Sequence, residues 1–433
     1  MANAPHVPVH LGSMSDSVKT VMRENAGDFH EGDAFVLNSP YNGGTHLPDV
    51  TVSTPVFAQG RPVFWLGSRG HHADIGGRTP GSAPPDSRHI EEEGVLIDNE
   101  RLVSRGTFLQ DDAVAMLSSG RYPCRNVEQN MADLKAQVAA NETGRQGLLE
   151  IADRYGLDVV IAYMGHVQAN AEESVRRVLS DLPNGSYDYE MDHGARVKVT
   201  VTVDQNAREA VIDFTGTSPQ QEGNYNAPYS ICRAVVLYVF RTLVGSNIPL
   251  NEGCLPTLRI VAPDGSMLNP TYPAAVIAGN TEVSQAMCNA LYGALGFIAG
   301  SQATMNNFVW GNETFQNYET ICGGTWAGPG FDGCDAVQSH MTNTRMTDPE
   351  ILEKRFPVRL ESFGIREGSG GAGTWQGGNG SYRRLRFLTP VTVTTLCSHR
   401  RVPPFGVDGG APGAVGENWA ELPDGTRRDL AGN

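Results

Sequence analysis

The sequence predicts an α+β fold in several layers, rich in strands and loops, with a helical middle segment. Fifty glycines and 26 prolines among 433 residues are many for a helical protein. Runs of β-branched and aromatic residues mark strands near both ends, and apolar residues recur at helical spacing between them. Because the chain exceeds the usual size of one core, we expect a β-rich region over residues 1–110, a helical region over 111–190 and a mixed α/β region over 191–433.

The first region should contain a β-hairpin. Residues 50–57 and 62–67 are rich in β-branched and aromatic side chains, and Gln59 and Gly60 form the turn between them. A hairpin returns the chain to where it began, so the start of the first strand lies beside the end of the second. Pro48 and nearby glycines keep both ends out of helices. The residues that flank the hairpin therefore meet at one end of a rigid ribbon.

Two groups of metal-binding side chains flank this hairpin. His46 and Asp49 precede the first strand, and His71, His72 and Asp74 follow the second. Imidazole nitrogen with carboxylate oxygen suits zinc, manganese or iron better than calcium, which prefers oxygen ligands alone. We therefore expect one divalent ion at this end of the hairpin, zinc or manganese. The alternative is that these are polar side chains of surface turns.

The middle of the chain should be helical from about residue 111 to residue 182. Leu134 and Val138 are spaced to share one helical face, and Asn170 is placed to cap a last helix over residues 171–182.

The last region alternates strands and helices. We expect strands over residues 196–203 and 210–214, helices over residues 230–244 and 282–297, and more strands, separated by glycine loops, between residues 361 and 396. The glycine runs between residues 368 and 380 lack the GxxxxGK[ST] pattern of a phosphate loop and predict turns between strands. No nucleotide-binding motif stands out. The absence of a Gly-x-Ser-x-Gly elbow or a Cys/His pairing disfavours covalent catalysis.

A second group of polar residues begins the helix predicted over residues 282–297. One interpretation is that Thr281 is simply the N-cap of this helix. The other is that the free backbone N–H groups at the helix start and the Asn280 amide hold a phosphate or a substrate carbonyl. Asn280 and Glu282 are therefore candidate substrate-binding residues. The acidic run at residues 89–93 is better explained as the solvated start of a helix or strand.

Charge and cysteine content limit the partners and the compartment. Thirty-three basic and 48 acidic residues give a net charge of -15, which disfavours nucleic acid and anionic membrane surfaces as partners. Seven cysteines without CxxC spacing suit buried thiols in a reducing compartment. No signal peptide is visible and no apolar run is long enough to span a bilayer. We expect a cytoplasmic protein that binds neither nucleic acid nor membrane.

Six motifs occur along the chain in a recognisable order. They are His10-Leu11-Gly12-Ser13-Met14, Gly43-Gly44-Thr45-His46-Leu47-Pro48-Asp49, His71-His72-Ala73-Asp74-Ile75-Gly76-Gly77, Phe214-Thr215-Gly216-Thr217-Ser218, Pro249-Leu250-Asn251-Glu252-Gly253 and Gly279-Asn280-Thr281-Glu282-Val283-Ser284-Gln285. Together they resemble the B-type chain of the hydantoinase and 5-oxoprolinase family, which includes caprolactamase and the larger subunits of acetone and acetophenone carboxylases. The resemblance implies a hetero-oligomer in which an A-type chain of actin-like ATPase fold uses ATP to phosphorylate a lactam, imide or ketone oxygen, and the B-type chain completes the reaction.

The resemblance also implies roles for individual residues. The metal ligands of the family fall on His46, Asp49 and His71, with a fourth, acidic ligand from an upstream segment that is not in this sequence. The chain is therefore expected to be truncated at both ends. Phosphorylation makes the amide oxygen a leaving group, and a metal-held hydroxide can then attack the ring carbon. His72 and Asp74 are the candidate catalytic residues for proton transfer; equally, they are a packed histidine and a turn cap.

Three functions are compatible with these features. The first is a metal-dependent B-type chain that hydrolyses an ATP-activated cyclic amide. The second is a subunit of an ATP-dependent carboxylase of the acetone or acetophenone type, and the third is a non-catalytic scaffold for the ATPase partner. We favour the hydrolase because most relatives that share this motif set are described as hydrolases.

Overall fold

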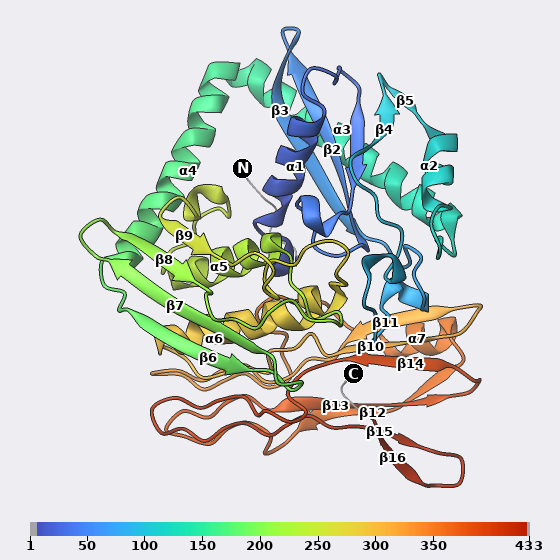
Figure 1. Ribbon diagram of the computed structural model, residues 1–433, viewed down its shortest axis with the longest axis vertical. Helices are drawn as coiled ribbons and strands as arrows, with labels where there is room; N and C mark the ends of the chain where they lie inside the picture. The colour runs from blue at the N-terminus through green and yellow to red at the C-terminus, as the bar shows by residue number, and fades with distance from the viewer. Residues whose placement is uncertain (1–6, 431–433) are drawn as a thin grey trace.

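The computed structural model describes residues 7–430, and its first sheet contains the predicted hairpin (Figure 1). The strands of this sheet are β1 (Ala34–Leu37), β2 (Asp49–Ala58), β3 (Arg61–His71), β4 (Glu100–Ser104) and β5 (Thr107–Phe108), in the order β3-β2-β1-β4-β5. Strands β2 and β3 are antiparallel, and Asp49 lies directly opposite His71. The predicted hairpin is confirmed, and it brings Asp49 beside His71.

Two helices hold the hairpin between them. The helices of this half are α1 (Ser13–Glu24), α2 (Gln110–Leu117), α3 (Val127–Tyr155) and α4 (Leu157–Leu179). Ser68 Oγ donates to the Gln137 carbonyl on α3 at 3.2 Å, whereas the next residue, Arg69, donates from Nη2 to Ser17 Oγ on α1 at 2.8 Å. Because successive strand residues point to opposite faces, α1 and α3 cover opposite faces of the hairpin.

The predicted helical middle is confirmed, but the predicted helix start at Asn170 is wrong. Helix α4 is continuous through this residue, and Ser174 Oγ donates to the Asn170 carbonyl at 2.7 Å within the helix. An asparagine inside a helix costs well under about 1 kcal/mol, whereas ending and restarting the helix would leave several backbone groups unpaired. The helix therefore continues.

The second sheet contains the largest hydrophobic cluster. Its strands, in order, are β6 (Gly185–Glu190), β7 (Arg196–Asp204), β8 (Glu209–Asp213) and β9 (Leu258–Val261). Val197, Val199 and Val201 are buried on one face, and the residues between them are exposed. Helices α5 (Tyr229–Leu243) and α6 (Ser284–Leu295) contribute their apolar side chains to the same cluster. These elements confirm the strands predicted over residues 196–203 and 210–214 and the helices predicted over residues 230–244 and 282–297.

The C-terminal part consists of short sheets. Its elements are β10 (Asn307–Gly311), β11 (Gln316–Thr320), α7 (Pro349–Arg355), β12 (Val358–Arg366), β13 (Gly380–Phe387), β14 (Thr392–Leu396), β15 (Asn418–Glu421) and β16 (Arg427–Leu430). Strands β11, β10 and β14 form one sheet in that order, and β12–β13 and β15–β16 are separate hairpins. The glycine runs connect β12 to β13, as predicted. In Figure 1, β10 and β11 lie below the end of the first sheet at which β2 begins and β3 ends.

Short helical turns connect these elements. They are the 3-10 helices η1 (Pro8–His10), η2 (Pro40–Asn42), η3 (Pro80–Ser82), η4 (Ile90–Glu92) and η5 (Glu252–Cys254), and the π-helix η6 (Gly279–Val283). The mixed α+β class predicted from the sequence is confirmed. None of the helices within residues 7–430 has the length and apolar character that crossing a membrane requires. None of the seven cysteines, which all lie within residues 7–430, forms a disulfide, and five of them are buried.

Candidate metal centre

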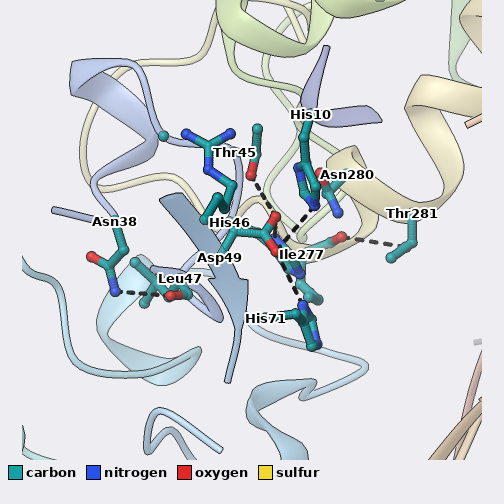
Figure 2. Close-up of polar contacts among 12 residues, drawn as sticks. His10, Asn38, Thr45, His46, Leu47, Asp49, His71, Ile277, Asn280 and Thr281 are labelled. Carbon is teal, nitrogen blue, oxygen red and sulfur yellow. Dashed lines mark hydrogen bonds and ion pairs between the residues drawn. The ribbon is translucent and has the colours of Figure 1, made fainter. Parts of the chain in front are cut away.

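The candidate metal centre forms around the Asp49 carboxylate (Figure 2). His46 Nδ1 lies 2.6 Å from Asp49 Oδ2, and His71 Nδ1 lies 3.1 Å from Asp49 Oδ1. One possible ligand atom from each of the three residues falls within 4.8 Å of the other two. Asp49 is fully buried, His46 is 3% exposed, and the His71 side chain is 44% exposed. The structure thus brings the three predicted ligands together.

The loop before β2 is held in place by close backbone packing. A Cβ atom at Gly44 would lie 2.4 Å from the Asn38 carbonyl oxygen, so only glycine fits there. Ser230 Oγ on α5 donates to the Gly44 carbonyl at 2.5 Å, and Asn38 Nδ2 donates to the Leu47 carbonyl at 2.9 Å. These contacts fix the position of His46 before any ion binds.

Two further residues contact Asp49 that sequence reasoning did not assign to the site. Thr45 Oγ1 donates to Asp49 Oδ2 at 2.6 Å, and His10 Nε2 lies 3.4 Å from Asp49 Oδ1. His10 Nδ1 is buried without a hydrogen-bond partner among the described residues. The motif around His10 is one of the six that carry the family resemblance, and that motif was the only sequence signal for it.

The protonation states suit metal binding. Burial alone would raise the pKa of Asp49, but the imidazoles of His10, His46 and His71 around it hold that pKa well below its usual range. Burial lowers the pKa of His46 and lowers that of His10 to about 3. At neutral pH the site therefore presents the ionised Asp49 carboxylate and the neutral imidazoles of His10 and His46, the forms that bind divalent metals. With His46, Asp49 and His71 as ligands, coordination positions remain for water and substrate, as catalytic metal sites require.

The structure places His72 and Asp74 away from this cluster. The buried His72 contacts Asn130 Nδ2 through Nδ1 at 2.9 Å and Gln137 Oε1 through Nε2 at 3.2 Å, both on α3. Asp74 accepts from the Gly76 N–H at 2.9 Å and pairs with Arg125 at 2.8 Å. Since neighbouring residues of an extended chain point to opposite sides, His72 faces α3 when His71 faces Asp49. The geometry favours the packed histidine and the turn cap over proton transfer.

The segment before α6 differs from the predicted N-cap. Thr281 lies inside the π-helix η6, and its hydroxyl donates backwards to the Ile277 carbonyl at 3.3 Å, so the N-cap prediction is wrong. Asn280 Oδ1 and Glu282 Oε2 are buried without hydrogen-bond partners among the described residues. Burial raises the pKa of Glu282 to about 8, so it is mainly protonated at neutral pH. A π-turn with unpaired polar atoms is a frequent feature of functional sites.

The acidic run at residues 89–93 is only partly solvated. Glu93 is 1% exposed, and its carboxylate accepts from the backbone N–H groups of Val276 and Ile277 at 3.0 Å each. Burial raises its pKa to about 7. The expectation of a solvated element start is wrong for Glu93, which ties the first region to the segment that leads into η6.

Comparison with known proteins places this geometry in a family. The family model for hydantoinase B/oxoprolinase matches residues 1–433. The chain belongs to the hydantoinase B/oxoprolinase family. It is 45% identical to 5-oxoprolinase 1 of Arabidopsis thaliana over all of this chain and 36% of that protein, and 46% identical to 5-oxoprolinase of Dictyostelium discoideum over 96% of this chain and 33% of that protein. The chain spans about a third of the length of these 5-oxoprolinases.

Two solved structures share the fold of this hydantoinase B/oxoprolinase chain. ATP-dependent caprolactamase from Pseudomonas jessenii matches with a TM-score of 0.84 at 25% identity, over 98% of this chain and 77% of the other. Nucleotide-free acetone carboxylase matches with a TM-score of 0.82 at 20% identity, over 95% and 59%, which shows the fold alone.

Proposed function

We propose that this chain is the metal-dependent part of an ATP-dependent cyclic amidase of the 5-oxoprolinase and hydantoinase type, working in the cytoplasm. The observation that supports it most directly is the convergence of His46, Asp49 and His71 in a chain 45% identical to a 5-oxoprolinase. The substrate is a lactam or imide ring activated by phosphorylation. ATP is used by an A-type, actin-like ATPase partner, as the family resemblance implies, and the lack of a GxxxxGK[ST] phosphate-binding loop in this sequence agrees with that.

The described residues suggest how the site acts on such a ring. When bound, a divalent ion, zinc or manganese, supplies a Lewis acid that lowers the pKa of a bound water. His46, Asp49 and His71 would hold it. The neutral Glu282 carboxyl can donate a hydrogen bond to a substrate oxygen, and Asn280 Oδ1 can accept one from a ring N–H. In this proposal His72 packs against α3 and Asp74 pairs with Arg125, and neither residue takes part in metal binding.

Metal analysis of matched variants tests the metal site. The unmodified chain should bind about one divalent ion, and His46→Ala and His71→Ala should lose it because few protein ligands remain. His166→Ala removes an exposed imidazole on α4 and serves as the control that keeps the ion. Elemental analysis of dialysed, folded protein is the measurement. If both His46→Ala and His71→Ala keep full metal occupancy, His46 and His71 are polar turn residues and not metal ligands.

Turnover assays distinguish the hydrolase from the alternatives. With its ATPase partner, the chain should consume ATP in the presence of 5-oxoproline and without bicarbonate. The second candidate is a carboxylase, the activity named for acetone carboxylase, which shares this fold. Its turnover would require bicarbonate and a ketone. A scaffold would support ATP hydrolysis equally well with His46→Ala. Full-rate ATP and ring hydrolysis by this chain alone would contradict the two-component proposal.

A further inference from the structure

His71 is the least constrained of the three candidate ligands. Its side chain is 44% exposed, whereas Asp49 and His46 are almost completely buried. Its Nδ1 lies 3.1 Å from Asp49 Oδ1, and its ring lies 5.2 Å from the His46 ring, centroid to centroid. A ligating imidazole usually depends on neighbouring groups for its orientation. With 44% of the side chain exposed, a further neighbour would complete that orientation.

Strand β11, far away in the sequence, provides such a neighbour. The Tyr318 ring lies 5.8 Å from the His71 ring, centroid to centroid, with 35° between their planes. The Tyr318 hydroxyl donates to Asn307 Oδ1 on the neighbouring strand β10. Tyr318 therefore has its ring against His71 and its hydroxyl fixed inside the sheet.

Asn307 is itself firmly held. It is 1% exposed, and its Nδ2 donates to the Leu396 carbonyl on β14 at 3.3 Å and approaches Glu282 Oε1 at 3.5 Å. The support for Tyr318 thus extends across all three strands of the sheet. It also reaches Glu282, the candidate substrate residue on η6.

The same strand also fixes the backbone that follows His71. Gln316 Nε2 donates to the Ala73 carbonyl at 2.7 Å. Because residues two apart on a strand lie on the same face, Gln316 and Tyr318 together contact the turn over residues 71–73. A rigid sheet from the C-terminal part therefore sets the position of this turn.

We propose that Tyr318 is a positioning residue that holds the His71 imidazole in its metal-binding orientation, through ring contact on one side and its hydroxyl bond to Asn307 on the other. The inference rests on the proposed metal site. It assigns to β11 the completion of a site whose ligands all come from the N-terminal part. The hydroxyl refines the placement of the ring, so phenylalanine should replace tyrosine better than alanine does.

The test is metal affinity, not turnover. The dissociation constant for Zn²⁺ is measured by chelator competition on Tyr318→Ala, Tyr318→Phe and the unmodified chain, and Co²⁺ absorption spectra report the ligand geometry. Loss of a supporting contact typically weakens metal binding by about 10-fold or more, which we expect for Tyr318→Ala together with an altered Co²⁺ spectrum. Tyr318→Phe should lie between the two. Tyr163→Ala, at a tyrosine 66% exposed on α4, should leave both readouts unchanged.

The outcomes separate this inference from the metal site itself. If the unmodified chain binds no divalent ion, the proposed function and this inference both fail. If it binds zinc and Tyr318→Ala binds equally tightly with the same cobalt spectrum, only the positioning role is overturned. If Tyr318→Ala does not fold, Gln316→Ala takes its place, because it removes the hydrogen bond to the Ala73 carbonyl in the same turn. Gln316→Ala must then weaken zinc binding. Unchanged affinity in Gln316→Ala and Tyr318→Phe would count against the role of β11.

Discussion

His71 and His72 are adjacent in sequence but belong to different parts of the structure. His71 faces Asp49 and solvent, whereas both nitrogens of His72 contact amide side chains of α3. The side of the backbone on which each ring lies decides its role. Substituting the two residues should therefore produce opposite effects.

The first prediction compares these two variants. His72→Ala should lower the free energy of unfolding by about 2 to 3 kcal/mol, because it leaves buried Asn130 and Gln137 groups unpaired, and it should keep the metal. His71→Ala should lose the metal with a smaller stability change, since the side chain is half exposed. Urea unfolding of the metal-free proteins and elemental analysis measure the two effects. Metal loss in folded His72→Ala would contradict the assignment.

The second prediction concerns the protonated Glu282. Its pKa in the folded chain, about 8, lies above the ordinary 4.5, so between these values the folded chain keeps a proton that the unfolded chain has released. The free energy of unfolding therefore falls as the pH rises from about 4.5 to about 8. Glu282→Gln cannot ionise and keeps the shape of the side chain. It should be more stable than the unmodified chain at pH 8, by up to a few kcal/mol, and about equal to it at pH 5.

Urea unfolding at pH 5, 6.5 and 8 measures this difference. Glu313→Gln, at an exposed glutamate, is the matched control and should track the unmodified chain at every pH. A Glu282→Gln advantage that is the same at all three pH values would show that Glu282 is already ionised in the folded chain.

Helices α3 and α4 both lie in the segment that the sequence predicts to be helical, but they differ in packing. Gln137 and Asn141 on α3 are buried and donate through their side chains to the carbonyls of Val50 and Val52 in the hairpin, at 2.9 and 3.0 Å. By contrast, residues 161–170 of α4 are exposed apart from the half-buried Val167. The two helices therefore differ in the burial of their side chains and not in helical propensity.

The third prediction follows from this contrast. Backbone amides of residues 161–170 should exchange with deuterium faster than those of residues 130–141, because local opening of α4 exposes little additional apolar surface. Hydrogen exchange followed by mass spectrometry compares peptides from the two helices. Equal protection of both segments in the isolated chain would show that α4 is stabilised by contacts that its exposure does not reveal.

At the scale of the whole molecule, the metal centre joins parts of the chain that are distant in sequence. His10 lies in η1, Asp49 and His71 lie in the hairpin, and Tyr318 lies in β11. An ion bound here would therefore connect the N-terminal and C-terminal parts of the chain. Binding to the folded chain alone must stabilise it by mass action.

The fourth prediction is that Zn²⁺ raises the thermal unfolding temperature. At a free concentration of about 100 times the dissociation constant, the folded state gains about 2.7 kcal/mol. His46→Ala should show almost no shift, and the His166→Ala control should shift as the unmodified chain does. Differential scanning calorimetry with and without Zn²⁺ measures this. A shift that survives in His46→Ala would place the stabilising ion elsewhere.

The sequence by itself determined the mixed α+β class, the hairpin and the meeting of His46, Asp49 and His71, because strand alternation and a two-residue turn are local properties that set which residues lie opposite each other. Only the tertiary structure decided the rest. His10 and Tyr318 reach the site from distant segments, and no local pattern encodes a contact between elements so far apart. The same holds for His72, whose neighbour α3 could not be placed from the sequence, and for η6, where packing between the first region and α6 replaced the expected cap with a π-turn. Local order follows from neighbouring residues, whereas the completed site depends on which surfaces are buried against each other.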